Sequence, residues 1–267
     1  MSTDTADDVQ LWYHTLDLPG RPPTNGWFDL RETAKSLPWP EVKGLRCLDI
    51  ATYDGFYAFE MERRGAASVV ATDISDHSEW DWPVMLREQG GEEYGRVVGE
   101  KGAGFEVAHA IHGSSVEKIE RNVYDLSPER DGTFDVVICG SLLLHLRDPV
   151  RAIEAVRSVC SGVFMSVEAV SLRLSKEFPN KPMAELGDRD VICQWWIANA
   201  AGHRRMLEAG GFEIEQSTGV FAVPFGPAHP VHTQRKSPRV RAAEFTRRAS
   251  MHGQDGVPHH AVLAKPR

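Results

Sequence analysis

Acidic side chains follow successive apolar runs of this chain, and their types and spacing suggest a site for a cationic ligand. Asp49 and Asp54 bracket the turn after the first run, Asp73 ends the second run, and Asp125 follows the third. In an open α/β sheet, ligands bind in the crevice beyond the carboxyl ends of the strands. If the runs are strands, these carboxylates therefore gather around one crevice.

The turn after the first run distinguishes between two classes of nucleotide ligand. A dinucleotide site needs Gly-x-Gly-x-x-Gly here, because a pyrophosphate must approach backbone amides closely. This turn, from Asp49 to Gly55, holds one glycine and two carboxylates. The negative charge disfavours a diphosphate and favours a nucleoside that is positive at this point. S-adenosylmethionine, which carries an ammonium and a sulfonium group, meets that requirement, whereas NAD does not.

The other strand ends supply the remaining contacts expected for such a cofactor. Asp73 stands 24 positions after Asp49, where an acid typically grips ribose hydroxyls, although helix capping is an alternative role. Asp125 is positioned to accept the amine of adenine, and the small pair Gly140-Ser141 lets the backbone pass close to the methionine part. The expected cofactor-binding residues are Asp49, Ala51, Thr52, Tyr53, Asp54, Gly55, Asp73, Ile74, Tyr124, Asp125, Gly140 and Ser141.

Three residues are candidates for proton removal from an acceptor. His145 follows the fourth run at the expected rim of the crevice, and the pKa range of histidine suits a general base. A structural histidine hydrogen-bonded at a helix entry is the alternative interpretation. His14 and Glu168 are the further candidates. Aromatic residues could line an acceptor pocket or form the packing core of a lid; these are Trp12, Tyr13, Trp27, Trp195 and Trp196.

The elements that must position these residues alternate between strand and helix from residue 45 onward. Strands are expected at 45–50, 67–73, 119–124, 134–139, 162–167, 212–214 and 260–264. Helices are expected at 56–64, 104–111 and 149–159, and a further helix follows the second insertion and ends at about residue 209. Asp148 and Pro149 are typical of a helix start. The pattern predicts an α/β, Rossmann-like, seven-stranded and mostly parallel sheet with helices on both faces.

Two insertions and an N-terminal segment complete the predicted organisation. We expect residues 1–40 to form a lid that contributes to the substrate site, and residues 41–267 to form the cofactor-binding domain. The insertions are placed at about 75–118 and 171–195.

Composition limits the possible classes of function. Of the 267 residues, 42% are hydrophobic and 25% charged, and the net charge of -8 disfavours non-specific binding to nucleic acid. The segment 234–248 is an exception, with six cationic residues against one glutamate, and is either a solvated face or an anion-binding patch. The four cysteines lack metal-ligand spacing, so we expect buried thiols and no metal. No apolar run is long enough for a membrane span, and the acidic start is unlike a signal peptide, so we expect a cytoplasmic protein without a membrane partner.

Several segments together resemble a known family of enzymes. They are CLDIATYDGFYAFEMERRGA, VVATDI, NVYDL, FDVVICGSLLLHLRDP and WWIANAAGHRRMLEAGGF. Over roughly residues 40–215 the chain resembles class I S-adenosylmethionine-dependent methyltransferases, in particular the branch of the tRNA wobble-uridine 5-oxyacetic acid methyltransferase and carboxymethyltransferase. Ala51 stands where the family has glycine, and Leu144 stands where the carboxymethyl-transferring members have tyrosine. Because leucine cannot donate that hydrogen bond, the resemblance implies methyl transfer.

Three functions remain open at this point. The first is methylation of a small-molecule metabolite at oxygen, nitrogen or carbon, suggested by the acidic charge and the aromatic lid. The second is methylation of a tRNA wobble uridine, suggested by the resemblance and the basic segment. The third is a non-catalytic protein that binds the cofactor.

Overall fold

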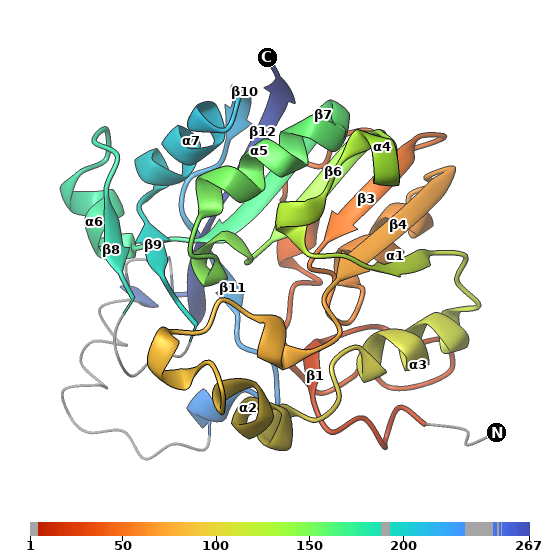
Figure 1. Cartoon of the computed structure of the whole chain (residues 1–267). Coiled ribbons are helices and arrows are strands. Elements are labelled where there is room, and N and C mark those ends of the chain that lie inside the picture. Colours follow the sequence, from red (N-terminus) through yellow and green to blue (C-terminus); the bar gives the residue numbers. More distant parts are fainter. Residues whose placement is uncertain (1–4, 188–192, 233–247, 250, 252) are drawn as a thin grey trace.

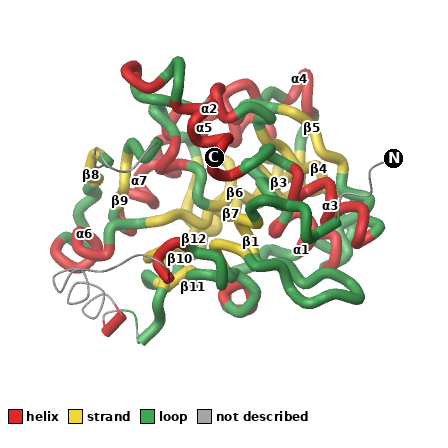
Figure 2. Tube along the Cα trace, turned by 90° about the horizontal axis from the view of Figure 1, so that it is seen from below, coloured by secondary structure: helices red, strands yellow, loops and turns green. Residues whose placement is uncertain are grey.

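The fold is described here from a computed structural model that places residues 5–187, 193–232, 248–249, 251 and 253–267 (Figure 1). The basic segment 234–248, apart from Arg248, therefore lies outside the described residues. A twisted sheet runs through the middle of the molecule and helices cover both of its faces (Figures 1 and 2). None of the helices in these ranges has the length and apolar character that crossing a membrane would require.

The central sheet has the strand order β10-β12-β7-β6-β3-β4-β5. Neighbours from β7 to β5 pair in parallel, whereas β12 is antiparallel to both β7 and β10. The predicted seven-stranded, mostly parallel sheet is therefore confirmed, and β11 adds an eighth strand against β12. The strands are β3 (Arg46–Ile50), β4 (Ser68–Asp73), β5 (Glu117–Glu120), β6 (Phe134–Gly140), β7 (Cys160–Ala169), β10 (Phe212–Ser217), β11 (Phe221–Pro224) and β12 (Gly256–Pro266).

Continuous apolar strands form the middle of the sheet because both of its faces are buried. Along β6, Val136 and Ile138 belong to one hydrophobic cluster, while Val137 and Cys139 belong to the cluster on the opposite face. Successive side chains of a strand point to opposite faces of the sheet, and both faces are buried here, so consecutive positions in the middle of the strand are apolar. All four cysteines are buried, as the sequence predicts.

The helices divide between the two faces of the sheet. Helices α1 (Phe56–Arg63) and α3 (Ala103–His112) contribute to one cluster, and α5 (Pro149–Val159) and α7 (Ala200–Ala209) to the other. The predicted start of α5 is confirmed, because Asp148 Oδ1 accepts the Arg151 amide at 3.1 Å. The remaining helices are α2 (Gly90–Val98), α4 (Pro128–Asp131) and α6 (Leu172–Glu177).

The third predicted strand is misplaced by the sequence analysis. It was expected at 119–124, but β5 ends at Glu120, and Val123–Asp125 form a 3-10 turn. The strand lies at the edge of the sheet and its sequence, EKIE, is mostly polar, so its apolar pattern is weak. Helix α2 within the first insertion and strand β11 were not predicted.

Short strands outside the main sheet attach the N-terminal segment and the second insertion to the core. Strands β1 (Trp12–His14) and β2 (Gly26–Phe28) pair in parallel, and a bridge from Phe28 to Phe225 links them to the chain after β11. Strands β8 (Ala184–Leu186) and β9 (Trp196–Ala198) form an antiparallel pair. Both small sheets lie near the end of the main sheet where the parallel strands finish.

Candidate functional site

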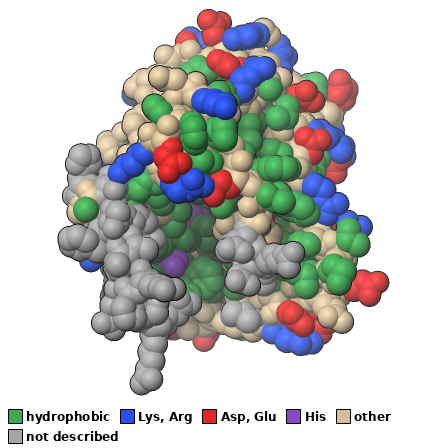
Figure 3. Space-filling view, turned by 90° about the vertical axis from the view of Figure 1, so that its left-hand side faces the viewer, with side chains coloured by type: hydrophobic (Ala, Val, Ile, Leu, Met, Phe, Trp, Pro, Cys, Tyr) green, Lys and Arg blue, Asp and Glu red, His purple; other side chains and the backbone are tan. Residues whose placement is uncertain are grey.

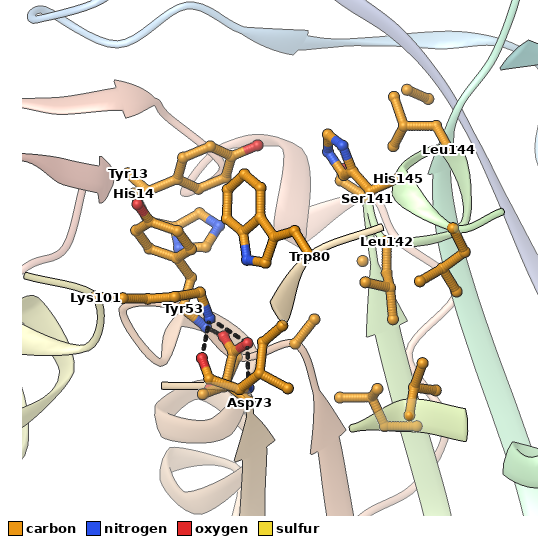
Figure 4. A pocket seen from close by; sticks show the side chains of 18 of the residues that line it. Tyr13, His14, Tyr53, Asp73, Trp80, Lys101, Ser141, Leu142, Leu144 and His145 are labelled. Carbon is orange, nitrogen blue, oxygen red and sulfur yellow. Dashed lines mark hydrogen bonds and ion pairs between the residues drawn. The ribbon is translucent and has the colours of Figure 1, made fainter. Parts of the chain in front are cut away.

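A cavity of about 350 Å³ opens beyond the carboxyl ends of β3, β4 and β6. The strand order reverses between β3 and β6, which is where open α/β sheets place their ligands. In Figure 4, Tyr13, His14, Tyr53 and Lys101 lie on one side of the cavity, Ser141, Leu142 and His145 lie on the other, and Trp80 stands between them. The volume is within the range of small-molecule sites.

The turn after β3 takes a strained backbone conformation as it enters the cavity. Ala51 and Tyr53 adopt left-handed φ angles of 58° and 49°, and both line the cavity together with Thr52. A left-handed φ is unfavourable for any residue with a Cβ, and such strain is commonly found at functional sites. Gly55, at φ 90°, precedes α1 and does not line the cavity, and a Cβ there would lie 2.4 Å from the Phe59 ring.

Asp73 at the end of β4 presents its carboxylate to the cavity from a fixed position. Its oxygens accept the amides of Tyr53 at 2.9 Å and Ile74 at 2.8 Å, and it forms an ion pair with Lys101. Lys101, from the first insertion, also donates to the Ile74 carbonyl at 2.7 Å. A carboxylate offers about four lone-pair positions, so three partners leave one for a ligand hydroxyl, and displacement of Lys101 frees a second.

The structure does not bring the Asp49 and Asp54 carboxylates to the cavity wall. Asp49 accepts the Thr52 hydroxyl at 2.7 Å and the Ala58 amide at 3.1 Å, and so ties the turn to α1. Asp54 accepts the Tyr13 and His14 amides, at 2.5 and 2.8 Å, and so anchors β1. Burial raises the pKa of each carboxyl to about 7. Of the three acids at the ends of β3 and β4 that were expected to favour a cationic ligand, only Asp73 therefore faces the cavity.

After β5 the structure presents Asn122 to the cavity instead of Asp125. Asp125 is exposed and lies away from the lining residues, because the strand ends four residues earlier than expected. Tyr124 lines the cavity as expected, and its hydroxyl donates to Asp81 at 2.8 Å. Val123 adds an apolar surface beside it. An amide and apolar side chains at this strand end suit a purine base.

The turn after β6 brings Gly140 and Ser141 close to the cavity, as predicted. A Cβ at Gly140 would lie 2.5 Å from the Tyr57 ring, so a glycine is required for this approach. Glu168 does not line the cavity. Its carboxylate accepts the amides of Leu142 at 3.3 Å and Leu143 at 3.1 Å, and burial raises the pKa of this carboxyl to about 8. The structure thus places Glu168 as a support for the turn and not among groups that reach a substrate.

His145 lines the cavity, as the sequence analysis expects of a candidate base. Its Nδ1 lies 2.7 Å from the Cys193 carbonyl. Because a carbonyl only accepts, Nδ1 must carry the proton, which leaves Nε2 with the lone pair. Burial lowers the pKa of His145, so the ring is neutral near pH 7.

The N-terminal segment covers the cavity with some, but not all, of the aromatic residues singled out from the sequence. Tyr13, His14 and Trp27 line it, and burial lowers the pKa of His14 to about 3. Trp12 is buried in the core and donates to the Ala6 carbonyl at 3.1 Å. Trp195 lies outside the cavity and donates to the Asp81 carbonyl at 2.7 Å, so it joins the two insertions.

The lining residues that the sequence analysis did not single out include Trp80, Lys101, Asn122 and His259. Trp80 and Lys101 belong to the first insertion, whose sequence has no regular pattern. Asn122 was hidden by the misplaced strand. His259 immediately precedes the predicted strand 260–264, and a position at the start of a strand beside a crevice was a signal that could have identified it.

The residues present fit S-adenosylmethionine on chemical grounds. Asp73 offers an acceptor for ribose hydroxyls, and Ile74, Val123 and Asn122 offer an apolar and amide surface for adenine. The turn after β3 has no row of glycine amides for a diphosphate. Among the described residues, the buried Asp49 Oδ1 has no hydrogen-bond partner.

Comparison with known proteins agrees with this interpretation of the fold. Residues 96–162 match the family model described as "Methyltransferase domain". Among curated proteins, no sequence matches the chain. A putative S-adenosylmethionine-dependent methyltransferase from Listeria monocytogenes is similar in structure, with 13% identity, coverage of 89% of this chain and 97% of that chain, and a TM-score of 0.50.

Two further solved structures have the same fold. A putative methyltransferase from Bacillus halodurans is 17% identical over 89% of this chain and 99% of that chain, with a TM-score of 0.50. A chain in the complex between the Haloferax volcanii Trm112 methyltransferase activator and the putative methyltransferase is 13% identical over 89% and 88%, with a TM-score of 0.51. The matched domain model, on this sheet, indicates an S-adenosylmethionine-dependent methyltransferase of the class I, Rossmann-like type. The wobble-uridine branch finds no support in these matches.

Proposed function

We propose that this methyltransferase acts on a small-molecule acceptor, at an oxygen or a nitrogen atom. The observation that carries the proposal is the aromatic wall of the cavity. The N-terminal segment contributes Tyr13, Trp27 and Phe28 to this wall, and the first insertion contributes Trp80 and Tyr94. A concave site with such walls shields the reacting groups from water and suits a compact substrate.

In the proposed complex, the cofactor lies across the carboxyl ends of β3, β4 and β5. Asp73 holds the ribose, and the backbone of Gly140 and Ser141 lies against the methionine part. The cofactor supplies an electrophilic methyl group on a sulfonium. The protein orients the acceptor in line with that group and takes up a proton when the acceptor is a hydroxyl.

His145 and His14 stay candidates for the base in this proposal. His145 presents the lone pair of Nε2, and His14 has a buried Nδ1 without a hydrogen-bond partner in the protein. Both rings line the cavity and are neutral near pH 7 because burial lowers the pKa of each. Geometry alone therefore leaves more than one imidazole able to accept a proton.

Transfer of a radiolabelled methyl group from S-adenosylmethionine into a metabolite extract tests the proposal. We expect labelled product of low molecular mass from the wild-type protein and none without protein. A protein that binds the cofactor but labels nothing in any extract would be a non-catalytic cofactor-binding protein, and the proposal would be wrong.

The tRNA alternative predicts a different dependence on salt. A protein that contacts several phosphates loses affinity steeply as ionic strength rises. The net charge of -8 argues against this, and the basic segment 234–248 is the sequence feature that speaks for it. A binding titration with bulk tRNA at two salt concentrations separates the cases, and we expect no binding at either.

A further inference from the structure

A serine and a histidine in the cavity form a hydrogen-bonded pair that the proposed function has not yet used. Ser141 Oγ lies 2.9 Å from His259 Nε2, and His259 Nδ1 lies 2.9 Å from the Val257 carbonyl. The carbonyl only accepts, so Nδ1 carries the proton and Nε2 has the lone pair. The Ser141 hydroxyl must therefore donate to Nε2. A hydroxyl, an imidazole base and an orienting carbonyl are connected in series.

The pair lies in the half of the cavity opposite Asp73. The sheet order from β4 through β3, β6 and β7 to β12 puts four strand spacings, roughly 19 Å, between the strand of Asp73 and that of His259. Ser141, at the end of β6, stands near the middle. If the nucleoside occupies the end over β4 and β5, the acceptor has the end over β7 and β12, and Ser141 faces the point where the two meet.

The acceptor half contains no charged side chain among the cavity-lining residues that the structure describes. The charged lining residues all come from the end of β4, the chain after β5, or the first insertion: Asp73, Glu79, Asp81, Lys101 and Arg121. The opposite half is lined by Trp27, Phe28, Tyr57, Val223 and Val257. In the space-filling view, a hollow in one face of the molecule is lined by hydrophobic side chains with histidine inside it (Figure 3). Such a surface favours a flat, uncharged molecule.

We propose that Ser141 and His259 are the proton-accepting pair for an aromatic hydroxyl acceptor bound in this half of the cavity. The inference rests on the proposed methyltransferase function. It assigns the base to a residue pair beside the acceptor.

The proposed step conserves atoms and charge. The acceptor oxygen forms a bond to the methyl carbon as the carbon–sulfur bond breaks, and the electron pair of that bond stays on sulfur. The acceptor proton passes to Ser141 Oγ while the serine proton passes to His259 Nε2. The products are the aryl methyl ether, the neutral thioether and an imidazolium, which releases its proton to solvent after turnover.

Two properties of the pair fit this task. Ser141 has a φ of 54°, so its hydroxyl is held in a backbone conformation that is costly for a serine. Burial lowers the pKa of His259 to about 4, so the ring is neutral at pH 7 with the lone pair of Nε2 toward Ser141, and as a weak base it takes up the proton only as bond formation to the methyl carbon makes the acceptor hydroxyl acidic. His145 lies on the same side of the cavity as Ser141, but its ring is 6.4 Å from that of Trp80 and its Nδ1 is held by the Cys193 carbonyl, so it is a rival base that the test must separate from the pair.

The test uses matched histidine variants and ring-matched acceptors. His259→Gln and Ser141→Ala are compared with His145→Gln and His14→Gln, the two rival bases, and with His112→Gln on α3, which lies outside the cavity. Phenol, catechol and 4-methylphenol are offered as hydroxyl acceptors, and aniline is offered as the amine of the same shape. Labelled methyl transfer gives kcat and KM, and calorimetry gives the Kd of S-adenosylhomocysteine for every variant.

We expect His259→Gln to lower kcat for the phenols about 100-fold, because general bases typically contribute 10²- to 10⁴-fold. Ser141→Ala should lower it by a smaller factor, with KM, the Kd of S-adenosylhomocysteine and the His112→Gln control unchanged. The deficit of His259→Gln should shrink at high pH, where the phenol ionises by itself, and a merely structural role would not produce this change. In 15N-histidine-labelled protein without cofactor, the His259 Nε2 resonance should shift when phenol is added.

Each contrary result identifies which proposal fails. Absence of binding of S-adenosylhomocysteine to the wild type would remove the methyltransferase function itself. Normal binding with undiminished turnover in His259→Gln, or a loss confined to His145→Gln, would overturn the pair as the base. Turnover of aniline but of no phenol, or of none of the four acceptors, would overturn the assignment of an aromatic hydroxyl.

Discussion

Replacement of Asp73 by Asn tests the placement of the cofactor ribose most sharply. The substitution keeps the shape of the side chain but removes its charge and one of its acceptor oxygens. Hydrogen bonds to charged groups contribute about 1.5–3 kcal/mol each, against about 0.5–1.5 kcal/mol for neutral pairs. Asp73 keeps one free lone-pair position beside its bonds to Tyr53, Ile74 and Lys101. Loss of one charged hydrogen bond to the ribose therefore corresponds to a Kd about 10- to 150-fold higher.

Asp125→Asn is the matched control for this measurement. Both residues were predicted to bind the cofactor, but Asp125 is exposed and lies away from the cavity. Calorimetric titration with S-adenosylhomocysteine should show the loss for Asp73→Asn and an unchanged Kd for Asp125→Asn, with thermal unfolding recorded for both. A Kd within twofold of wild type for Asp73→Asn, or a loss confined to Asp125→Asn, would refute the reasoning.

Three further substitutions test separate parts of the structure. Ala51→Gly should raise the free energy of unfolding by about 0.5–1 kcal/mol, because Ala51 has a left-handed φ of 58° that glycine adopts without strain. An unchanged free energy of unfolding in urea would contradict the presence of backbone strain at Ala51. Glu168→Gln removes a carboxyl whose folded-state pKa, about 8, lies above the unfolded value of about 4.3, so the stability it contributes at low pH is lost as pH rises from about 4 to 8. Relative to wild type, this variant should therefore gain about 3.5 kcal/mol between pH 5 and pH 8, and a pH-independent difference would argue against the raised pKa. Trp195→Phe removes the 2.7 Å bond to the Asp81 carbonyl and should cost about 1 kcal/mol of stability with kcat retained, whereas a large rise in KM would return Trp195 to the substrate site.

The sheet could be predicted from the sequence because its central strands are buried on both faces. The buried positions of β3, β4, β6 and β7 are mostly apolar, and the strand ends coincide with Asp73, Gly140 and the turn at Ala51. Most of the residues expected at these strand ends therefore line the cavity, namely Ala51, Thr52, Tyr53, Asp73, Ile74, Gly140 and Ser141, whereas Asp49, Asp54 and Gly55 do not. The edge strand β5 lacks this pattern, and the error in its end moved the expected contact from Asn122 to Asp125.

The acceptor half of the cavity could not be predicted because its residues meet only through tertiary structure. His259 and Ser141 are 118 positions apart and come together because β12 lies antiparallel beside β7, next to β6. Lys101 reaches Asp73 from an irregular insertion. Asp54 is a residue for which the sequence predicts a role that the structure does not show. It was expected to face the cofactor, but its carboxylate accepts the amides of Tyr13 and His14 in β1.

Calorimetry on the purified protein with S-adenosylmethionine, S-adenosylhomocysteine and NAD tests the central claim most directly. We expect one molecule of either adenosyl compound to bind per chain with measurable heat, and NAD to give none. Heat for NAD with none for S-adenosylmethionine or S-adenosylhomocysteine would contradict the account.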